Sequence, residues 1–478
     1  MFKVPRVIPC IALVGSFAFP NGQELRWDWN SIDPVIEQTI QELPKKITFG
    51  TAVAEHQVSG AVNCPHSNWA AIEDKTDKHG KPRIHNGEKS GKACDFWNNY
   101  QADIQHMLAL GVKAFRFSIE WSNIEPKKGL IDRAAIKHYH DLCDALIAAG
   151  IEPVVTLHHF THPQWFEEMG AFENEENIKY FVKFSTLMVQ ELGEKVMLWS
   201  TFNEPGVYIF QGYCRGVWPP FKIGLNRASW VYRNVMKAHV DAYQAIKALP
   251  NGDKVQVGLV HDLVQFEPFN APFAYTNYAY HLEKMMCDYM NHLFHDCITQ
   301  FLATGKLEIK VPLLANLEYE NKAGAHSLDW IGLNYYSHVL LRAQLPEVLK
   351  PDYRPEEIRT EMPYAIYPEG FYRAIKYFDE TIAKPQGIPI YITENGISDA
   401  KDTSRALYIK RYLFAMHQAI AEGCDVRGYF YWSLLDNFEW AEGYSMKFGL
   451  YDVDMQTQKR TLRAGAQPLV DLLTKNAQ

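Results

Sequence analysis

The chain has no excess of basic residues: 48 lysines and arginines stand against 56 aspartates and glutamates, for a net charge of −8. Binding to nucleic acid phosphates needs a basic surface, so no nucleic acid partner is expected. Apolar runs are also short, and none approaches the roughly 20 residues of a transmembrane helix. No low-complexity block, fixed repeat or long linker divides the 478 residues. These absences favour one large globular unit without a membrane-spanning segment.

Metal-binding patterns are lacking as well. The eight cysteines form no CxxC pair and fit no zinc spacing, so buried free thiols are expected. His158, His159 and His162 form an HHxxH run. Neighbouring residues of a strand point to opposite faces, however, so His158 and His159 do not readily ligate one ion. The sequence therefore predicts neither a metal nor a cofactor.

Residues 1–46 precede the first expected strand and form an N-terminal arm. Basic residues before the apolar stretch 7–14, followed by small residues near 16–18, resemble a short signal peptide over 1–18. Two prolines suit its helix poorly, so an apolar arm packed on the domain is an equal alternative. Ile32–Leu43 is expected to be a short helix. The compartment stays open between the cytoplasm and secretion.

Short apolar strands alternate with amphipathic helices along the rest of the chain. The expected strands are Ile47–Ala54, Ala114–Trp121, Glu152–Phe160, Leu198–Glu204, Lys254–Asp262, Trp330–Ser337, Pro389–Asn395 and Val426–Leu435. Asp103–Leu110, Ala134–Ala149 and Asn177–Leu192 show the 3.6-residue period of helices. Alternation predicts a parallel sheet, and eight units predict closure into a single (β/α)8 TIM barrel over 47–478. Loop insertions are expected at its C-terminal face, including a long loop within 339–389.

Two glutamates each end an apolar, strand-like run. Glu204 closes Leu198–Glu204 before a proline, and Glu394 lies near the end of Pro389–Asn395, before a glycine. Catalytic groups of an α/β barrel lie at the C-terminal ends of its strands. Two carboxylates at that rim suggest one acid/base and one nucleophile.

Further polar and aromatic side chains fall at the same strand ends. They are Gln57, Arg116, His159, Asn203, Asn334, Tyr336, Trp432, Glu439 and Trp440. Gln57 is placed here by extending the first strand through Glu55-His56-Gln57. Hydroxyl groups need donors and acceptors fixed in direction, and the apolar face of a sugar needs rings. This set suits a polyhydroxylated ligand.

Several segments resemble the retaining β-glucosidases of glycoside hydrolase family 1. Thr201–Pro205 is similar to the family's acid/base motif and Ile392–Gly396 to its nucleophile motif. Trp432–Trp440 matches the family's strand-eight segment throughout, and Arg116–Ile119 matches as well. The resemblance runs from about Ile47 to about Asp454.

The resemblance implies a role for each site residue. Glu394 would attack the anomeric carbon, and Glu204 would protonate the leaving oxygen and later deprotonate water, with the carboxyls ~5–5.5 Å apart. Arg116 and Tyr336 would hold Glu394 ionised, with Asn334 in support. The residues that would bind the sugar are Gln57, His159, Asn203, Glu439 and Trp440, with Trp432 as the platform under the ring.

The chain departs from the family pattern near its first two strands. Ser59 stands where the family commonly has glutamate, Phe160 where it often has tryptophan, and Asn123 where arginine is common. Glu55 is unusual too. An altered environment around Gln57 is therefore expected.

Three positions bear on the substrate. The family's phosphate-reading branch uses Ser, Lys and Tyr where this chain has Glu439, Met446 and Phe448. A carboxylate repels a phosphate, so an unphosphorylated sugar is expected, with glucosides, galactosides and fucosides all acceptable. Thioglucosidases of the family lack the acid/base glutamate. Because this chain has a glutamate, Glu204, at that position, the resemblance implies O-glycosides as substrates. Loop residues near Phe210, Trp218, Val339 and Tyr364 would meet the leaving group.

The resemblance thus implies an enzyme, a retaining β-glucosidase with a small-molecule β-glycoside as its partner. A transglycosylase would use the same residues and differ in its acceptor. A non-catalytic sugar-binding barrel is the other alternative, although such relatives typically lack one of the two carboxylates. Nothing in the sequence indicates an oligomeric state.

Overall fold

The computed structural model describes residues 27–270, 278–311, 313–344, 347–355 and 357–475. The expected signal peptide over 1–18 lies outside these residues. None of the helices in the described ranges is long and apolar enough to cross a membrane.

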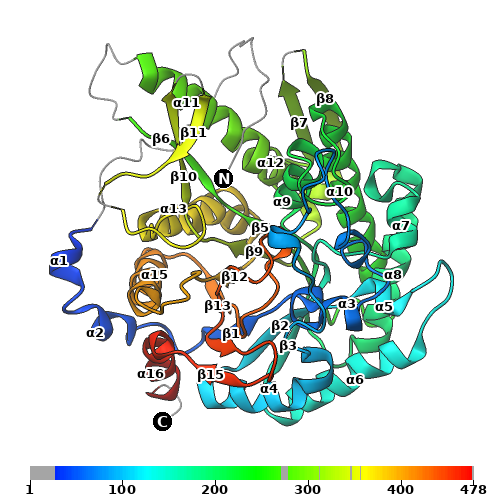
Figure 1. The fold of residues 1–478 in the computed structure, drawn as a ribbon, viewed down its shortest axis with the longest axis horizontal. Coiled ribbons are helices and arrows are strands. Elements are labelled where there is room, and N and C mark those ends of the chain that lie inside the picture. The colour runs from blue at the N-terminus through cyan, green and yellow to red at the C-terminus, as the bar shows by residue number, and fades with distance from the viewer. Residues whose placement is uncertain (1–26, 271–277, 312, 345–346, 356, 476–478) are drawn as a thin grey trace.

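Eight parallel strands form a closed barrel at the centre of the molecule (Figure 1). They are β1 Thr48–Ala52, β2 Ala114–Ser118, β3 Glu152–His158, β4 Leu198–Asn203, β5 Gln256–Asp262, β9 Trp330–Asn334, β12 Ile390–Asn395 and β13 Val426–Trp432. Each pairs with its neighbour in the order β1-β13-β12-β9-β5-β4-β3-β2, and β2 closes the ring on β1. All eight expected strands and the TIM-barrel class are confirmed.

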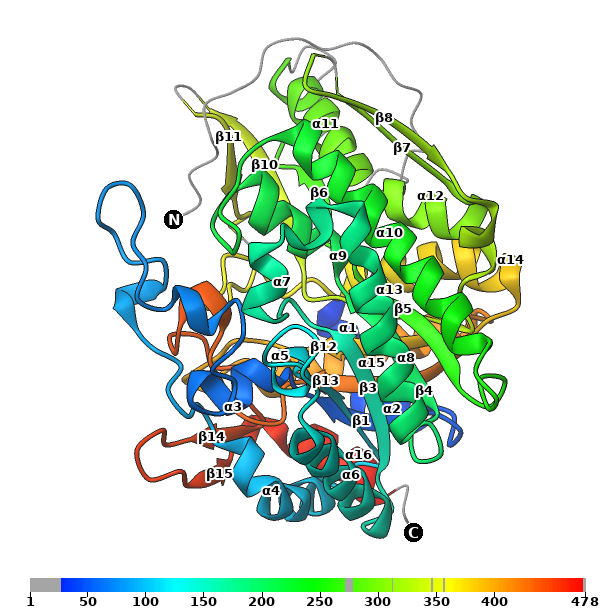
Figure 2. The ribbon, with the colours of Figure 1, turned by 90° about the vertical axis from the view of Figure 1, so that its right-hand side faces the viewer.

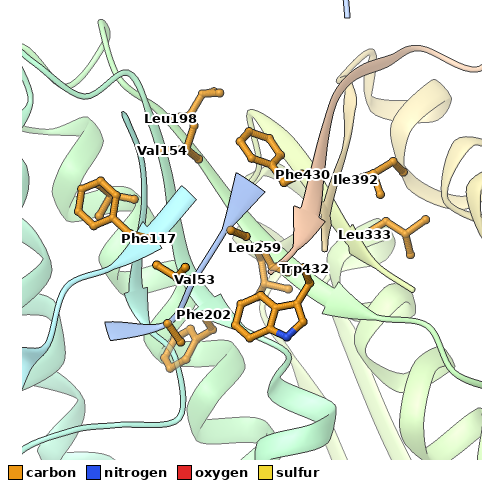
Figure 3. Packing of buried hydrophobic residues seen from close by; sticks show 14 of the residues in the cluster. Val53, Phe117, Val154, Leu198, Phe202, Leu259, Leu333, Ile392, Phe430 and Trp432 are labelled. Atoms are coloured by element: carbon orange, nitrogen blue, oxygen red, sulfur yellow. The ribbon is translucent and has the colours of Figure 1, made fainter. Parts of the chain in front are cut away.

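The strands are buried along most of their length, which explains their nearly continuous apolar sequence. Every residue of β2, β4 and β9 is buried. Leu198, Leu259, Leu333, Ile392 and Phe430 belong to neighbouring strands and gather in one hydrophobic core (Figure 3). This core fixes the register of the strands and so the position of every residue at the barrel mouth.

Helices surround the barrel. The longer ones are α4 Phe96–Leu110, α6 Arg133–Ala148, α8 Ile178–Leu192, α10 Leu225–Lys247, α11 Tyr278–Asn291, α12 Cys297–Thr304, α13 Pro368–Phe378, α15 Arg405–Ala421 and α16 Gln467–Lys475. The expected helices over 103–110, 134–149 and 177–192 are confirmed as parts of α4, α6 and α8, with residues 149 and 177 falling just outside the last two. Asp132 caps α6 by accepting from the N–H groups of Ala134 and Ala135. Gly111 ends α4 in the left-handed conformation, with φ at +81°.

The helix expected over Ile32–Leu43 is wrong in extent. The structure has two short helices, α1 Trp29–Ile32 and α2 Ile36–Ile40, separated by a turn. Pro34 lies in that turn and lacks the N–H that a continuous helix would use. Asp33 accepts a hydrogen bond of 2.6 Å from Nη2 of Arg411, which ties this segment to α15.

Among the described residues, three further sheets lie outside the barrel, and none was expected. β6 Gln265–Pro268, β10 His338–Gln344 and β11 Glu347–Asp352 form a small sheet beyond the C-terminal ends of β5 and β9 (Figures 1 and 2). Of these strands, β10 and β11 fall in the stretch where a long loop was predicted. β7 Lys306–Val311 and β8 Ala315–Glu320 form a hairpin, and β14 Tyr451–Val453 pairs with β15 Arg460–Leu462. Extending the first strand to Gln57 was also wrong, because Glu55–Asn63 form helix α3.

Candidate active site

Glu204 lies at the turn between β4 and the short helix α9, Pro205–Ile209. Its backbone is left-handed, with φ at +46°, a conformation uncommon for glutamate. The Glu204 N–H donates to the carbonyl of Val260 on β5 over 2.8 Å, and Pro205 then begins α9. The strand therefore ends at Glu204, at the C-terminal rim of the barrel.

Glu394, near the end of β12, accepts a hydrogen bond at each of its two carboxylate oxygens. Nη1 of Arg116 donates to Oε1 over 2.6 Å, and the hydroxyl of Tyr336 donates to Oε2 over 2.6 Å. Arg116 is 1% exposed and Glu394 3% exposed, so this pair is shielded from solvent. Two short, charge-assisted contacts of this kind fit an anionic carboxylate with one fixed orientation.

Glu204 has a different environment. Its Oε1 accepts a hydrogen bond of 2.6 Å from the amide of Asn334. Burial raises the pKa of Glu204 well above its usual value, and the charges of Asp262 and Glu394 raise it further. The Asn334 hydrogen bond and the Arg116 charge oppose this shift without cancelling it.

One hydrogen-bond network joins the two glutamates. Nη2 of Arg116 donates to Oδ1 of Asn203 over 2.8 Å. Nδ2 of Asn334 lies 3.1 Å from that same oxygen while it holds Glu204. The structure therefore brings together the two carboxylates and the three residues expected to support them, including Tyr336.

A third carboxylate, Asp262, lies beside this network and was not among the expected site residues. It ends β5 and pairs in register with Asn334 on β9, which in turn pairs with Glu394 on β12. Side chains directly opposite one another on paired strands share a face, so these three form a row across the rim. Burial and then the Glu394 charge raise the pKa of Asp262 to about 8. The only sequence signal for it was its position as the last residue of an expected strand.

Gln57 and Glu439 meet on another part of the rim. Nε2 of Gln57 donates to Oε2 of Glu439 over 2.9 Å and to Oδ1 of Asn437 over 3.0 Å. Burial raises the pKa of Glu439 to about 8, the Gln57 hydrogen bond opposes this, and the charges of Glu394 and Glu442 add to it. Gln57 reaches this place from helix α3 rather than from a strand.

His159 connects the carboxylates to the aromatic residues. Its ring is nearly parallel to the rings of Trp432 and Trp440, at centroid distances of 5.8 and 6.1 Å. Its Nε2 lies 3.2 Å from Nδ2 of Asn203 and 4.0 Å from Oε1 of Glu394. Burial, with the Arg116 charge, lowers the pKa of His159 well below its usual value, which keeps the ring neutral. Every expected sugar-binding residue thus lies in one connected set.

The HHxxH run separates as the strand geometry predicts. Nε2 of His158 lies 3.2 Å from Nδ1 of His162, and Nε2 of His162 lies 2.6 Å from Glu167. His159 instead contacts Asn203 at the barrel mouth. His158 and His159 therefore belong to different environments.

The expected loop residues fall into two groups. Phe210 and Val339 pack against one small apolar cluster built around Phe266. The ring of Trp218 contacts Trp440 at 5.9 Å, and the ring of Tyr364 lies 6.3 Å from that of Tyr336. Trp218 and Tyr364 thus contact residues of the site directly.

Comparisons with known proteins agree with this geometry. The sequence profile of Glycosyl hydrolase family 1 matches residues 39–478. Beta-glucosidase A of Thermotoga maritima is 30% identical over 446 residues, covering 89% of this chain and 96% of the relative. Beta-glucosidase 20 of Arabidopsis thaliana is 32% identical over 473 residues, covering 88% and 86%.

Solved structures show the same relationship. The beta-glycosidase from Pyrococcus horikoshii is 35% identical, with a TM-score of 0.77 over 91% of this chain and 95% of that one. The Thermotoga maritima beta-glucosidase in complex with galacto-hydroximolactam is 28% identical, with a TM-score of 0.79 over 91% and 99%. The chain belongs to glycosyl hydrolase family 1.

Proposed function

We propose that this family 1 glycosidase hydrolyses unphosphorylated β-D-glycosides, glucosides above all, with retention of configuration. One observation carries the proposal: Glu204 and Glu394 share a hydrogen-bond network but have opposite surroundings. Glu394 is held by a guanidinium and a phenol, whereas Glu204 is held by an amide and has a raised pKa. Two neighbouring carboxyl groups, one held by positively polarised donors and the other with a raised pKa, suit a nucleophile and a general acid.

In the first step Glu394 attacks the anomeric carbon and the glycosidic bond breaks. Glu204, protonated because its pKa is raised, gives its proton to the leaving oxygen. Arg116 and Tyr336 fix the attacking carboxylate, so little reorganisation is needed at the moment of reaction. Asn334 holds the acid in place through its 2.6 Å hydrogen bond.

In the second step Glu204 acts as the base. Once Glu394 is part of a glycosyl ester it carries no charge, so one of the causes that raise the pKa of Glu204 is gone. Glu204 then takes a proton from water, and that water attacks the anomeric carbon and releases Glu394. Two successive inversions give net retention.

The sugar would be held by the polar groups around the two carboxylates. Asn203, which accepts a hydrogen bond from Arg116, would bind the 2-hydroxyl, and Gln57 with Glu439 would bind the outer hydroxyls. His159 adds a neutral imidazole, and Trp432 offers a ring for the apolar face of the sugar. An amide and a carboxyl group can bind a hydroxyl in either orientation at carbon 4, which supports galactosides and fucosides as further substrates.

Glu439 and Phe448 should exclude phosphorylated sugars from the site. Glu439 would repel a phosphate when ionised. Phe448 is buried, 5.9 Å from the ring of Tyr336, and offers no donor from its side chain. Neither side chain provides the positive charge that a phosphate requires.

The test is replacement of Glu394 by alanine, with azide added as an external nucleophile. The variant E394A should lose hydrolysis of an aryl β-glucoside, and azide should restore turnover to give the α-glucosyl azide, because azide replaces a nucleophile on the α face. Glu318 lies 70% exposed on the β7–β8 hairpin, so E318A is a matched control and should keep full activity. Hydrolysis that survives in E394A, or a β-azide product, would overturn the proposal.

A further inference from the structure

Several residues that depart from the family pattern lie together and have no part in the proposed reaction. Glu55 and Ser59 belong to α3, whereas Asn123 belongs to α5, Trp121–Ile124, which follows Glu120. Figures 1 and 2 both place α3 beside α5. Nδ2 of Asn123 donates to the carbonyl of Asn63 over 2.9 Å, which joins the two helices directly.

A cluster of three potential metal ligands lies at this junction. A ring nitrogen of His56, the sulfur of Cys64 and a carboxylate oxygen of Glu120 all lie within 4.8 Å of one another. The three residues are 1%, 0% and 0% exposed. His56 and Cys64 come from the two ends of α3, which is interrupted at Gly60, with φ at +64° and a virtual Cβ only 2.3 Å from the carbonyl oxygen of Gly91.

The cluster lacks a positive charge. Glu55 and Glu120 are buried, and no ion pair of either with a lysine or arginine is found in the described ranges; His162 is the group outside the cluster whose charge acts on Glu120. Glu120 uses Oε1 to accept from the N–H of Ser122 over 3.2 Å. Its Oε2 and Nε2 of His56 are buried and make no hydrogen bond of good geometry among the residues that the structure describes, although the hydroxyls of Ser122 and Thr161 lie near the carboxylate. Unpaired buried groups of this kind are costly unless a ligand satisfies them.

We propose that His56, Cys64 and Glu120 bind a divalent transition-metal ion, with Zn²⁺ as the best match. Nitrogen, sulfur and carboxylate oxygen are the ligands that zinc prefers, at bond lengths of ~2.0–2.3 Å. Tetrahedral coordination puts ligand atoms ~3.3–3.8 Å apart, so ligand atoms that now lie up to 4.8 Å apart would move together by about 1 Å on binding. The thiol proton passes to solvent on binding, and the thiolate and the carboxylate together balance the two charges of the ion. This site was not predicted from the sequence, because residues 56, 64 and 120 match no standard spacing of metal ligands.

The surroundings of His56 suit a metal ligand. Its Nδ1 lies 3.3 Å from the hydroxyl of Ser67, and its Nε2 lies 3.9 Å from a carboxylate oxygen of Glu73. Whichever nitrogen binds the ion, the other has an oxygen nearby to orient the ring. Gln57 follows directly, and the ring of Trp440 is parallel to that of His56 at 6.2 Å. The ion would therefore stabilise the corner that holds Gln57 and Trp440, apart from the two catalytic glutamates.

Metal content tests the site directly. Untagged full-length protein, produced with added zinc and dialysed, should contain about one zinc per chain by plasma mass spectrometry. The variants C64A and E120Q should fall to background. Cys297, a fully buried free cysteine on α12, lies away from α3 and α5 (Figure 2), so C297A should keep its zinc. Zinc at background in the wild type, or zinc retained in C64A, would overturn the assignment.

Absorption spectra of bound Co²⁺ give a second test of the site. They need no enzyme assay, and they compare the wild type with several variants, so the result does not depend on whether one variant folds. Co²⁺ added to the metal-free protein should produce a near-ultraviolet thiolate-to-cobalt band in the wild type and in C297A. That band should be absent in C64A, while E120Q, which keeps the thiol, should bind cobalt more weakly. Chelation should lower the Tm of the wild type but not that of C64A. No cobalt band in the folded wild type would refute ligation by Cys64.

Discussion

Replacement of Asp262 by asparagine should move the alkaline limb of the pH–rate profile to lower pH. The variant D262N keeps the shape of the side chain but removes the negative charge that Asp262 carries above its own pKa of about 8, and that charge helps to raise the pKa of Glu204. Glu204 must be protonated to assist departure of the leaving group. Activity is therefore lost as pH rises through its pKa, and a lower pKa means loss at a lower pH.

The size of the shift follows from the position of Asp262. Asp262 ends β5, and Glu204 follows the last residue of the paired strand β4. Asn203 stands opposite Val260, so Glu204 and Asp262 are diagonal neighbours, for which we assume a separation of ~7 Å. Two unit charges at that distance interact by ~1–2.5 kcal/mol at an effective dielectric constant of about 20–40. Each pKa unit corresponds to ~1.4 kcal/mol, so the limb should move by about one to two pH units.

The assay is kcat/KM against pH for a β-glucoside whose poor leaving group depends on the acid. An activated dinitrophenyl glucoside, which needs little protonation, should show a much smaller change. Asp241 pairs with Lys237 near the surface of α10, so D241N is a control for the loss of one carboxylate. An alkaline limb that stays in place in D262N, with activity at low pH intact, would refute the electrostatic role of Asp262.

The remaining predictions concern the acid, the support of the nucleophile and the stability of the fold. The variant E204Q should slow poor leaving groups far more than activated ones, and azide should then give a β-configured azide; equal losses for both classes in steady-state kinetics would argue against an acid role. The variant Y336F removes a 2.6 Å hydrogen bond to the nucleophile worth ~1.5–3 kcal/mol, so kcat/KM should fall by about 10- to 100-fold through a lower kcat. A fall that came only from a higher KM would contradict this reasoning. The variant R460A leaves Asp103 buried without its charge partner, so the free energy of unfolding measured in urea should fall by ~3–5 kcal/mol. The control R427A breaks an exposed ion pair and should lower it by under ~1 kcal/mol. Equal losses in the two variants would contradict the importance of the buried pair.

The barrel was predictable from the sequence because its strands are buried along most of their length. That burial makes each strand a nearly continuous apolar run, which can be recognised locally. Glu204 and Glu394 were recognisable for the same reason, since each stands where such a run ends. The small sheet of β6, β10 and β11 was not predictable, because β10 and β11 are short neighbours that pair with β6 from a distant part of the chain.

The missed residues needed tertiary information. Gln57 lies beside Glu439, as expected, but it was assigned to the wrong element, because the change from β1 to α3 occurs within a few buried residues. Asp262 lies in no motif, and only the pairing of β5 with β9 places it beside Asn334. His56, Cys64 and Glu120 are also separated in sequence and meet only where α3 packs near α5.

Trapping of the covalent intermediate tests the central claim most directly. A 2-deoxy-2-fluoro-β-D-glucosyl fluoride slows the second step more than the first, so the folded enzyme should gain the mass of one fluorosugar per chain. Peptide mapping should place that label on Glu394, and prior occupation by a competitive inhibitor should prevent labelling. A label on any other residue, or an α-configured hydrolysis product, would contradict the assignment of Glu394 as the nucleophile.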